Sequence, residues 1–203
     1  MRKILVLLLA LAAFPLFAQE KETAKEAMPM TPPNPLEDDF YKWMIGDWEG
    51  WTTSSMGKAQ EWQKIEWGLD NQFVVVHNTS KWTEMNQEFL KAMSEATKMS
   101  KEDMDKMKNT VYKGMGVFTL HPMSSDFNGY WFDNWRGVSK GIGKREGDTV
   151  TMTWESPMGT ETRTIEKISE DNMVMTFKVK DPTGKEVEGR TEFTRKKVAP
   201  KKT

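Results

Sequence analysis

The chain has 203 residues, with 29 basic side chains against 30 acidic ones and a formal net charge of −1 at pH 7. This balance gives no electrostatic reason to expect a nucleic acid or an anionic membrane surface as a partner. The absence of cysteine excludes disulfides, so the core must stabilise the fold, and nine tryptophans and ten phenylalanines can contribute to it.

The first 18 residues resemble a secretory signal peptide. They begin with two basic residues, continue with an apolar run over residues 4–13 and end on Ala18. The run is shorter than the roughly 20 apolar residues that a spanning helix needs. We therefore expect export to the periplasm or the medium, with no integral membrane segment after cleavage. Residues 19–35 are expected to form a flexible leader, and residues 198–203 a basic tail.

Residues 36–45 are predicted to form a short helix. Phe40, Trp43 and Met44 recur at helical spacing and give it one apolar face. Acidic residues occupy its first turn, and Gly46 suits its end.

From Asp47 onward the apolar period changes to two, which is typical of strands with one buried face. Short segments rich in Gly, Asp, Asn and Pro separate the strands, and the second of them contains the turn residues 69–71. Ten strands at near-regular spacing predict a closed barrel or a sandwich within one domain, residues 36–197. The predicted strands span residues 47–54, 59–67, 72–80, 111–121, 127–135, 137–145, 148–156, 160–168, 172–180 and 187–196.

Residues 83–109 interrupt the strand pattern with helical spacing. Met85, Phe89 and Met93 belong to an apolar stripe, and Ser100 starts a second helix with an acidic residue at the capping-box position. The sequence therefore predicts a helical hairpin between the third and fourth strands.

Three segments carry a resemblance to a known family. Residues 43–50, Trp-Met-Ile-Gly-Asp-Trp-Glu-Gly, contain the Gly-x-Trp pattern that opens calycin barrels, and they resemble the opening of a bacterial family catalogued as domain of unknown function 1579. Residues 129–133 and 193–195 resemble that family's aromatic strand and its terminal strand ending in arginine. The resemblance covers residues 40–196. The chain departs from the family's pattern in the His-Pro turn at 121–122, where the family has Asp-Pro, and in its long helical insert.

The resemblance implies a mainly β fold, an antiparallel up-and-down barrel of the lipocalin-like (calycin) kind, and no established activity. In calycins a tryptophan at the base of the first strand packs against an arginine of the last strand, which here implies Trp48 and Arg195. A guanidinium over an indole contributes about 0.5–2 kcal/mol. If the first strand starts at this closed base, the connection between strands three and four lies at the open end. We therefore expect residues 83–109 to form a lid over the mouth, the alternative being an insert that packs on the outside.

The barrel interior is the expected site. Ten strands enclose more space than the eight of small lipocalins, so we expect a small apolar or amphipathic ligand. The alternative is an interior filled by its own side chains. Alternation leaves the facing of the second, fifth and sixth strands open. The expected pocket-lining residues are Trp62, Glu66, His77, Trp131, Asp133, Met152, Trp154, Met175 and Phe177.

No nucleophile elbow, phosphate-binding loop or zinc-protease motif occurs, and no acid–base pair stands out by spacing. The sequence therefore predicts no catalytic residue, cofactor or metal site, favours a binding protein over an enzyme, and leaves the oligomeric state open. Four alternatives remain: an enzyme using Glu66 with His77 or Asp133, haem held by His77, Cu(I) held by methionines of the insert, and an envelope module that binds proteins. The candidates for an exposed patch on such a module are Trp51, Trp67 and Trp82.

Overall fold

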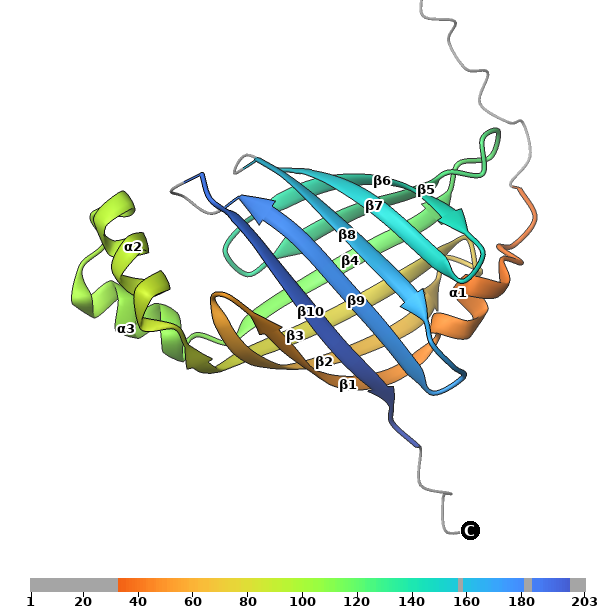
Figure 1. The fold of residues 1–203 in the computed structure, drawn as a ribbon. Coiled ribbons are helices and arrows are strands. Elements are labelled where there is room, and N and C mark those ends of the chain that lie inside the picture. Colours follow the sequence, from red (N-terminus) through yellow and green to blue (C-terminus); the bar gives the residue numbers. More distant parts are fainter. Residues whose placement is uncertain (1–32, 157–158, 181–183, 198–203) are drawn as a thin grey trace, which may run out of the picture. The chain divides into compact units, whose positions relative to one another are not determined.

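The computed structural model describes residues 33–156, 159–180 and 184–197 as one closed antiparallel barrel. Each strand pairs with its neighbours in chain order, and the first pairs with the last (Figure 1). This confirms the predicted up-and-down barrel of ten strands. The predicted signal peptide, most of the predicted leader and the basic tail lie outside the described residues. Within the described part, no helix is long and apolar enough to cross a membrane.

All ten predicted strands are present, together with the short first helix and the helical pair. The largest boundary difference is in the third strand, which continues to Met85 because Glu84 and Met85 still pair with Lys58 and Gly57. The elements are α1 (Asp39–Met44), β1 (Gly46–Ser54), β2 (Gly57–Gly68), β3 (Phe73–Met85), α2 (Gln87–Thr97), α3 (Lys101–Asn109), β4 (Tyr112–Leu120), β5 (Phe127–Asp133), β6 (Val138–Glu146), β7 (Thr149–Ser156), β8 (Gly159–Lys167), β9 (Asn172–Lys180) and β10 (Glu186–Arg195).

Helix α1 lies across one end of the barrel, which we call the base (Figure 1). Asp38 caps it by accepting a hydrogen bond from the backbone N–H of Tyr41 at 3.0 Å. Four of its six residues, Phe40, Tyr41, Trp43 and Met44, are buried. The helix therefore plugs the base with apolar side chains.

The first and last strands meet at the base through Trp48 and Arg195. These residues pair across β1 and β10, and the guanidinium carbon of Arg195 lies 4.1 Å from the centroid of the Trp48 rings. Nη1 and Nη2 of Arg195 donate to the carbonyls of Ile45 and Trp43, both at 2.6 Å. The arginine thus covers the fully buried indole and ties the end of α1 to the last strand.

Gly46 explains the first position of the Gly-x-Trp pattern. Its φ of +139° is rare for residues that carry a side chain, and a Cβ there would lie only 2.6 Å from Nη1 of Arg195. Only glycine leaves room for the arginine to reach over Trp48, so the motif and the closing arginine form one structural unit.

The base half of the barrel is filled. Its core joins the apolar face of α1 to inward side chains of the strands, and the rings of Phe118 and Trp154 meet edge to face with centroids 5.8 Å apart. The strand residues of this core are Trp48, Ile65, Val74, Val76, Phe118, Phe127, Val150, Met152, Trp154, Met173 and Phe193.

Helices α2 and α3 lie at the opposite end, which we call the mouth (Figure 1). Asn86 caps α2 by accepting from the N–H of Glu88 at 2.8 Å. Ser100 caps α3 by accepting from the N–H of Asp103 at 3.1 Å, and its hydroxyl donates to the Asp103 carboxylate at 2.6 Å. The insert is therefore a pair of separately capped helices, as its sequence predicts.

Candidate ligand-binding cavity

The mouth half of the barrel contains a cavity of about 580 Å³. This volume lies within the range of small-molecule sites, roughly 300–1,000 Å³. Inward side chains of the strands form its walls, and side chains of α2 and α3 complete it. The barrel is thus packed at the base and hollow toward the mouth.

Most side chains that line the cavity are apolar or aromatic. Trp131 lies over Gly114 of the neighbouring strand, where a Cβ would approach the indole to 2.2 Å, so the glycine makes room for the ring. The indole N–H of Trp131 donates to the Tyr112 hydroxyl at 2.7 Å, which fixes both rings. The other apolar and aromatic side chains in the walls include Trp82, Met85, Phe89, Met93, Met107, Met175, Phe177 and Val179.

The cavity also contains a buried carboxyl group, that of Glu61 on β2, a residue only 8% exposed. Its Oε1 accepts from the hydroxyls of Thr52 at 3.0 Å and Ser80 at 2.8 Å. Its Oε2 accepts from Nδ2 of Asn78 at 3.3 Å. Burial raises the pKa of Glu61 above its ordinary value, although these three hydrogen bonds oppose the shift.

A second charged group enters the cavity from β8. Arg163 donates through Nε to Oε1 of Glu161 at 2.8 Å, and Glu161 lies in the same wall. Burial is the largest single influence and acts to lower the pKa of Arg163, but the hydrogen bond and charge of Glu161, together with Tyr112 and Glu61, raise that pKa above its ordinary value. The guanidinium therefore stays charged inside the barrel, paired with a carboxylate of its own strand.

Three of the expected pocket residues do not line the cavity, and the expectation for them is wrong. Trp62, Glu66 and His77 lie on the outer surface, where Glu66 is bonded to Lys64 at 2.5 Å and to Nε2 of His77 at 3.4 Å. An interior acid–base pair of Glu66 and His77, and haem held inside the barrel by His77, are excluded by this placement.

The other expected pocket residues divide by depth. Met152 and Trp154 belong to the filled core below the cavity. Trp131, Met175 and Phe177 lie in the cavity walls. Asp133 lies in the wall near the mouth, where its Oδ1 accepts from the N–H groups of Trp135 and Gly137 and shapes the β5–β6 turn.

The three residues expected to face the barrel from the insert, Met85, Phe89 and Met93, all contribute to the cavity walls. Met107 of α3 joins them; the sequence places it on the apolar edge of the second helix but not among the expected lid residues. The sequence reasoning missed the polar part of the lining, made chiefly of Thr52, Glu61, Asn78, Ser80, Glu161 and Arg163.

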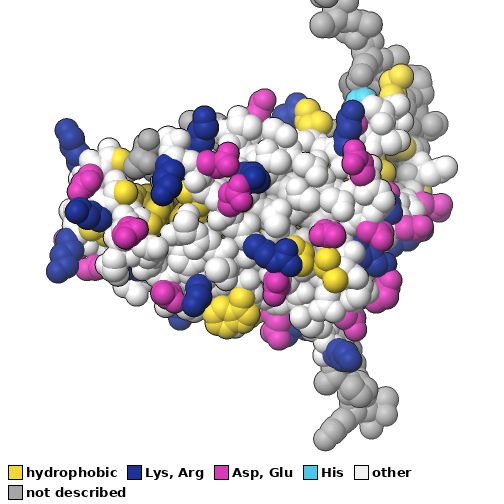
Figure 2. All heavy atoms as spheres, in the orientation of Figure 1, with side chains coloured by type: hydrophobic (Ala, Val, Ile, Leu, Met, Phe, Trp, Pro, Cys, Tyr) yellow, Lys and Arg dark blue, Asp and Glu magenta, His cyan; other side chains and the backbone are white. Residues whose placement is uncertain are grey.

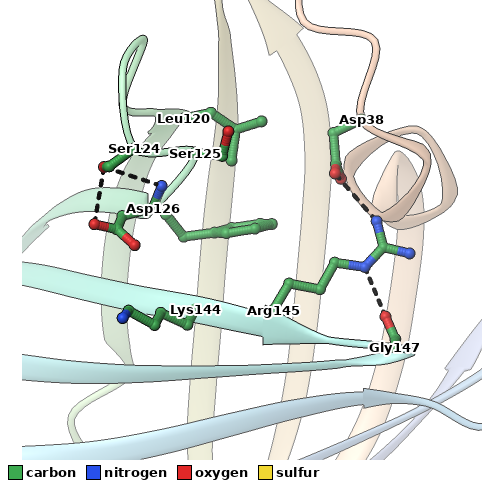
Figure 3. Close-up of a pocket in the computed structure, with 9 residues that line it drawn as sticks. Asp38, Leu120, Ser124, Ser125, Asp126, Lys144, Arg145 and Gly147 are labelled. Atoms are coloured by element: carbon green, nitrogen blue, oxygen red, sulfur yellow. Dashed lines mark hydrogen bonds and ion pairs between the residues drawn. The ribbon is translucent and has the colours of Figure 1, made fainter.

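A second hollow lies on the outer surface at the base, with a volume of about 670 Å³ (Figure 3). Its central side chain, Arg145, donates to the carboxylate of Asp38 at 3.1 Å and to the carbonyl of Gly147 at 2.6 Å. The guanidinium also lies 5.4 Å from the ring centroid of Phe40. These contacts anchor α1 to the β6–β7 hairpin, and we assign this hollow a structural role.

The three tryptophans expected to form an exposed patch do not share a surface. Trp51 is exposed, Trp67 packs against the core and Trp82 lies in the cavity wall. Basic and acidic side chains are interspersed over the face drawn in Figure 2. The residues that the structure describes contain no group of three or more His, Asp or Glu side chains that could hold a metal ion.

Comparisons with known proteins support the fold. No family model and no curated protein sequence matches the chain. An S-type phycobiliprotein lyase from Guillardia theta is similar in structure, with a TM-score of 0.51 and 13% identity over 79% of this chain and 92% of that one. A de novo designed fluorescence-activating β-barrel has a TM-score of 0.39 and 12% identity, covering 78% of this chain and 99% of that one.

A protein of unknown function from the DUF3598 family of Nostoc punctiforme has a TM-score of 0.26 and 8% identity over 79% of this chain and all of that one. Its TM-score and that of the designed barrel are below 0.5, so only the lyase bears on the fold. At 13% identity it shows the architecture alone: this chain is a closed barrel similar to that of the lyase.

Proposed function

We propose that this protein is an exported, lipocalin-like carrier or sensor that binds a small amphipathic molecule in the mouth cavity. The observation that supports this most directly is a cavity of about 580 Å³ that is lined by aromatic and methionine side chains together with a buried carboxyl group. A mostly apolar pocket with a few fixed polar groups is the usual composition of a small-molecule site. The same cavity argues against the alternative of a completely filled barrel.

The helical pair serves as the lid of this site. Phe89 and Met93 of α2 and Met107 of α3 close the cavity from the mouth, next to Met85 at the end of β3. Unbranched thioether side chains adapt to ligands of different shape. Only Leu90 is buried within α2, and α3 has no buried residue, so little packing energy holds the pair in place. Such a lid can open at low cost to admit a ligand.

Two further parts of the proposal rest on the sequence. The signal-like first 18 residues support export, and the segments at 43–50, 129–133 and 193–195 support membership of the domain-of-unknown-function 1579 family. The structural role of Gly46 beside Arg195 is consistent with the opening motif of that family.

The test is binding of N-phenyl-1-naphthylamine, a neutral apolar dye whose fluorescence rises in an apolar site. We expect saturable binding by the purified protein. Val179→Trp would fill the cavity from β9 and weaken binding at least about tenfold, which corresponds to about 1.4 kcal/mol. Thr176→Trp, on the outward face of the same strand, is the matched control and should bind like the parent chain. Absence of saturable binding, or full binding by Val179→Trp, would refute the proposal.

A second candidate function, docking of another protein surface, is favoured by one observation. Met115, Phe132 and Val138 are exposed and lie opposite one another across β4, β5 and β6, which makes a continuous apolar row on the outside of the barrel. Association with a second copy can be measured with this chain alone. Sedimentation velocity should show self-association that Phe132→Ser abolishes, and a concentration-independent monomer would exclude it.

A further inference from the structure

The cavity contains a buried hydrogen-bond acceptor that lacks a protein partner. Asn78 is 9% exposed, and its Nδ2 donates to Oε2 of Glu61 at 3.3 Å. This bond fixes the orientation of the amide, so the other atom of the group, Oδ1, is an acceptor. Within the described part of the chain, this Oδ1 is buried and has no hydrogen-bond partner. Burial of an unpaired acceptor is unfavourable, so the site is suited to a ligand that brings a donor.

The charged side chains that line the cavity also favour a ligand that carries donors and a positive charge. Three acidic side chains, Glu61, Asp133 and Glu161, face one basic side chain, Arg163. Glu161 is paired with Arg163, and Asp133 accepts from two backbone N–H groups of its turn. The three hydrogen-bond donors to Glu61 are neutral hydroxyl and amide groups. The charge of Arg163 also acts on Glu61, but this guanidinium is paired with Glu161.

The aromatic side chains of the cavity also favour a positively charged ligand. Trp82, Tyr112 and Trp131 place aromatic rings around the same cavity, and ring faces attract cations. An anionic ligand would have to compete with Glu161 for Arg163 and would lie in the field of the remaining carboxylates. The unpaired acceptor, the acidic side chains and the aromatic rings thus all favour a cationic ligand that donates hydrogen bonds.

We propose that the ligand is a cationic amphiphile whose protonated amine donates to Oδ1 of Asn78 and to the carboxylate of Glu61, while its apolar body lies against Trp131 and the helical lid. This inference rests on the proposed binding function and specifies its ligand class. It assigns Glu61 and Asn78 as the residues that determine specificity.

Three probes with the same chain length separate the possibilities: octylamine, 1-octanol and octanoate, each below its aggregation concentration at neutral pH. Each competes with N-phenyl-1-naphthylamine for the purified protein. We expect octylamine to displace the dye at a concentration at least about tenfold lower than octanoate, with octanol in between. Glu61→Gln should lower the affinity for octylamine about tenfold and change the affinity for octanol by less than about twofold. Asn78→Leu, which removes the acceptor with little change of volume, should act in the same direction.

Glu66→Gln is the matched control, because Glu66 lies on the outer face of the same strand. This variant should bind all three probes with the affinity of the parent chain. Dye binding by each variant shows that its barrel has folded. Equal displacement by the three probes, a preference for octanoate, or an octylamine preference that survives both Glu61→Gln and Asn78→Leu would overturn the inference while dye binding still stood. Failure of the parent chain to bind the dye would instead refute the proposed function itself.

Discussion

Burial of Glu61 couples the charge of the cavity to the stability of the barrel. Its pKa is raised above the ordinary 4.5 by burial, so the folded chain holds this proton more tightly than the unfolded chain does. The resulting stabilisation is fully present below about pH 4.5 and is lost as the pH rises through the raised pKa. Ionisation of Glu61 therefore costs more free energy in the folded barrel than in the unfolded chain.

Glu61→Gln should remove this pH dependence. The free energy of unfolding of the variant minus that of the parent chain should increase as the pH rises from about 4 to about 7. Only the parent has a carboxyl group at this position, and its proton is released more readily from the unfolded chain than from the folded one. Urea unfolding at several pH values measures this difference. For Glu66→Gln, the unfolding free energy of the variant minus that of the parent should decrease slightly over the same pH range, because the hydrogen bond from Lys64 lowers the pKa of exposed Glu66. A difference between Glu61→Gln and parent that stays constant with pH would contradict the burial argument.

Arg195 should be the most sensitive position at the base. Arg195→Ala would remove the contact with the Trp48 ring and leave the carbonyls of Trp43 and Ile45 without their donors. We expect a loss of about 2–5 kcal/mol in the free energy of unfolding, measured by urea titration. Arg195→Lys should recover only part of it, because one ammonium cannot reproduce the planar fork that reaches two carbonyls. Full recovery by lysine would mean that charge alone closes the base.

At the scale of the elements, one turn decided which side chains enter the cavity. Gly68 pairs with Phe73, so the β2–β3 turn has four residues, and three of them adopt left-handed conformations with φ of 47° to 62°. The sequence marks residues 69–71 as turn residues but does not fix the length of the turn, and a turn one residue shorter would shift the pairing of β2 and β3 by one residue. Because side chains alternate, such a shift exchanges the inner and outer faces of a strand. The true turn sends His77 outward and Asn78 inward.

The facing of β2 could have been derived from Trp48. Paired residues in an antiparallel sheet lie on the same face, and the short β1–β2 turn pairs Trp48 with Gln63. Buried Trp48 therefore places Glu61 and Ile65 inside and Trp62 and Glu66 outside. The strands themselves were predictable from their two-residue period and turn chemistry. The polar side chains of the cavity lining were not predictable in this way, because hydrophobicity alone favours Trp62 over Glu61 for an inward position.

The helical pair should control the rate of ligand exchange. Phe89→Ser and Met93→Ser remove apolar area from the cavity wall, so we expect faster dissociation of N-phenyl-1-naphthylamine and an affinity about tenfold lower for the double variant. Stopped-flow displacement measures the rate. Met104→Ser, a half-buried methionine of α3 outside the cavity lining, is the control. An unchanged dissociation rate in the double variant would show that the helical pair does not act as a lid over the cavity.

At the scale of the whole molecule, the packing of the barrel interior differs between its two ends. The base half joins α1, Trp48 and the inward apolar residues of most strands in one packed cluster, while the mouth half keeps its volume open. Close packing at one end can stabilise the closed sheet, so the other end is free to hold polar and charged groups. The position of a side chain along the barrel should therefore decide whether its loss affects folding or binding.

Met152→Ala and Phe177→Ala test this division. Met152 is 2% exposed in the base core, so its truncation should cost about 2–5 kcal/mol of unfolding free energy and leave the dye affinity of the folded fraction within about twofold. Phe177 is half-buried in the cavity wall, so its truncation should cost less stability and weaken the dye at least about fivefold. Urea unfolding and dye titration on the same preparations give both quantities. If both variants lost stability and affinity in the same proportion, the interior would act as one continuous core, and binding could not be tuned at the mouth without cost to the fold.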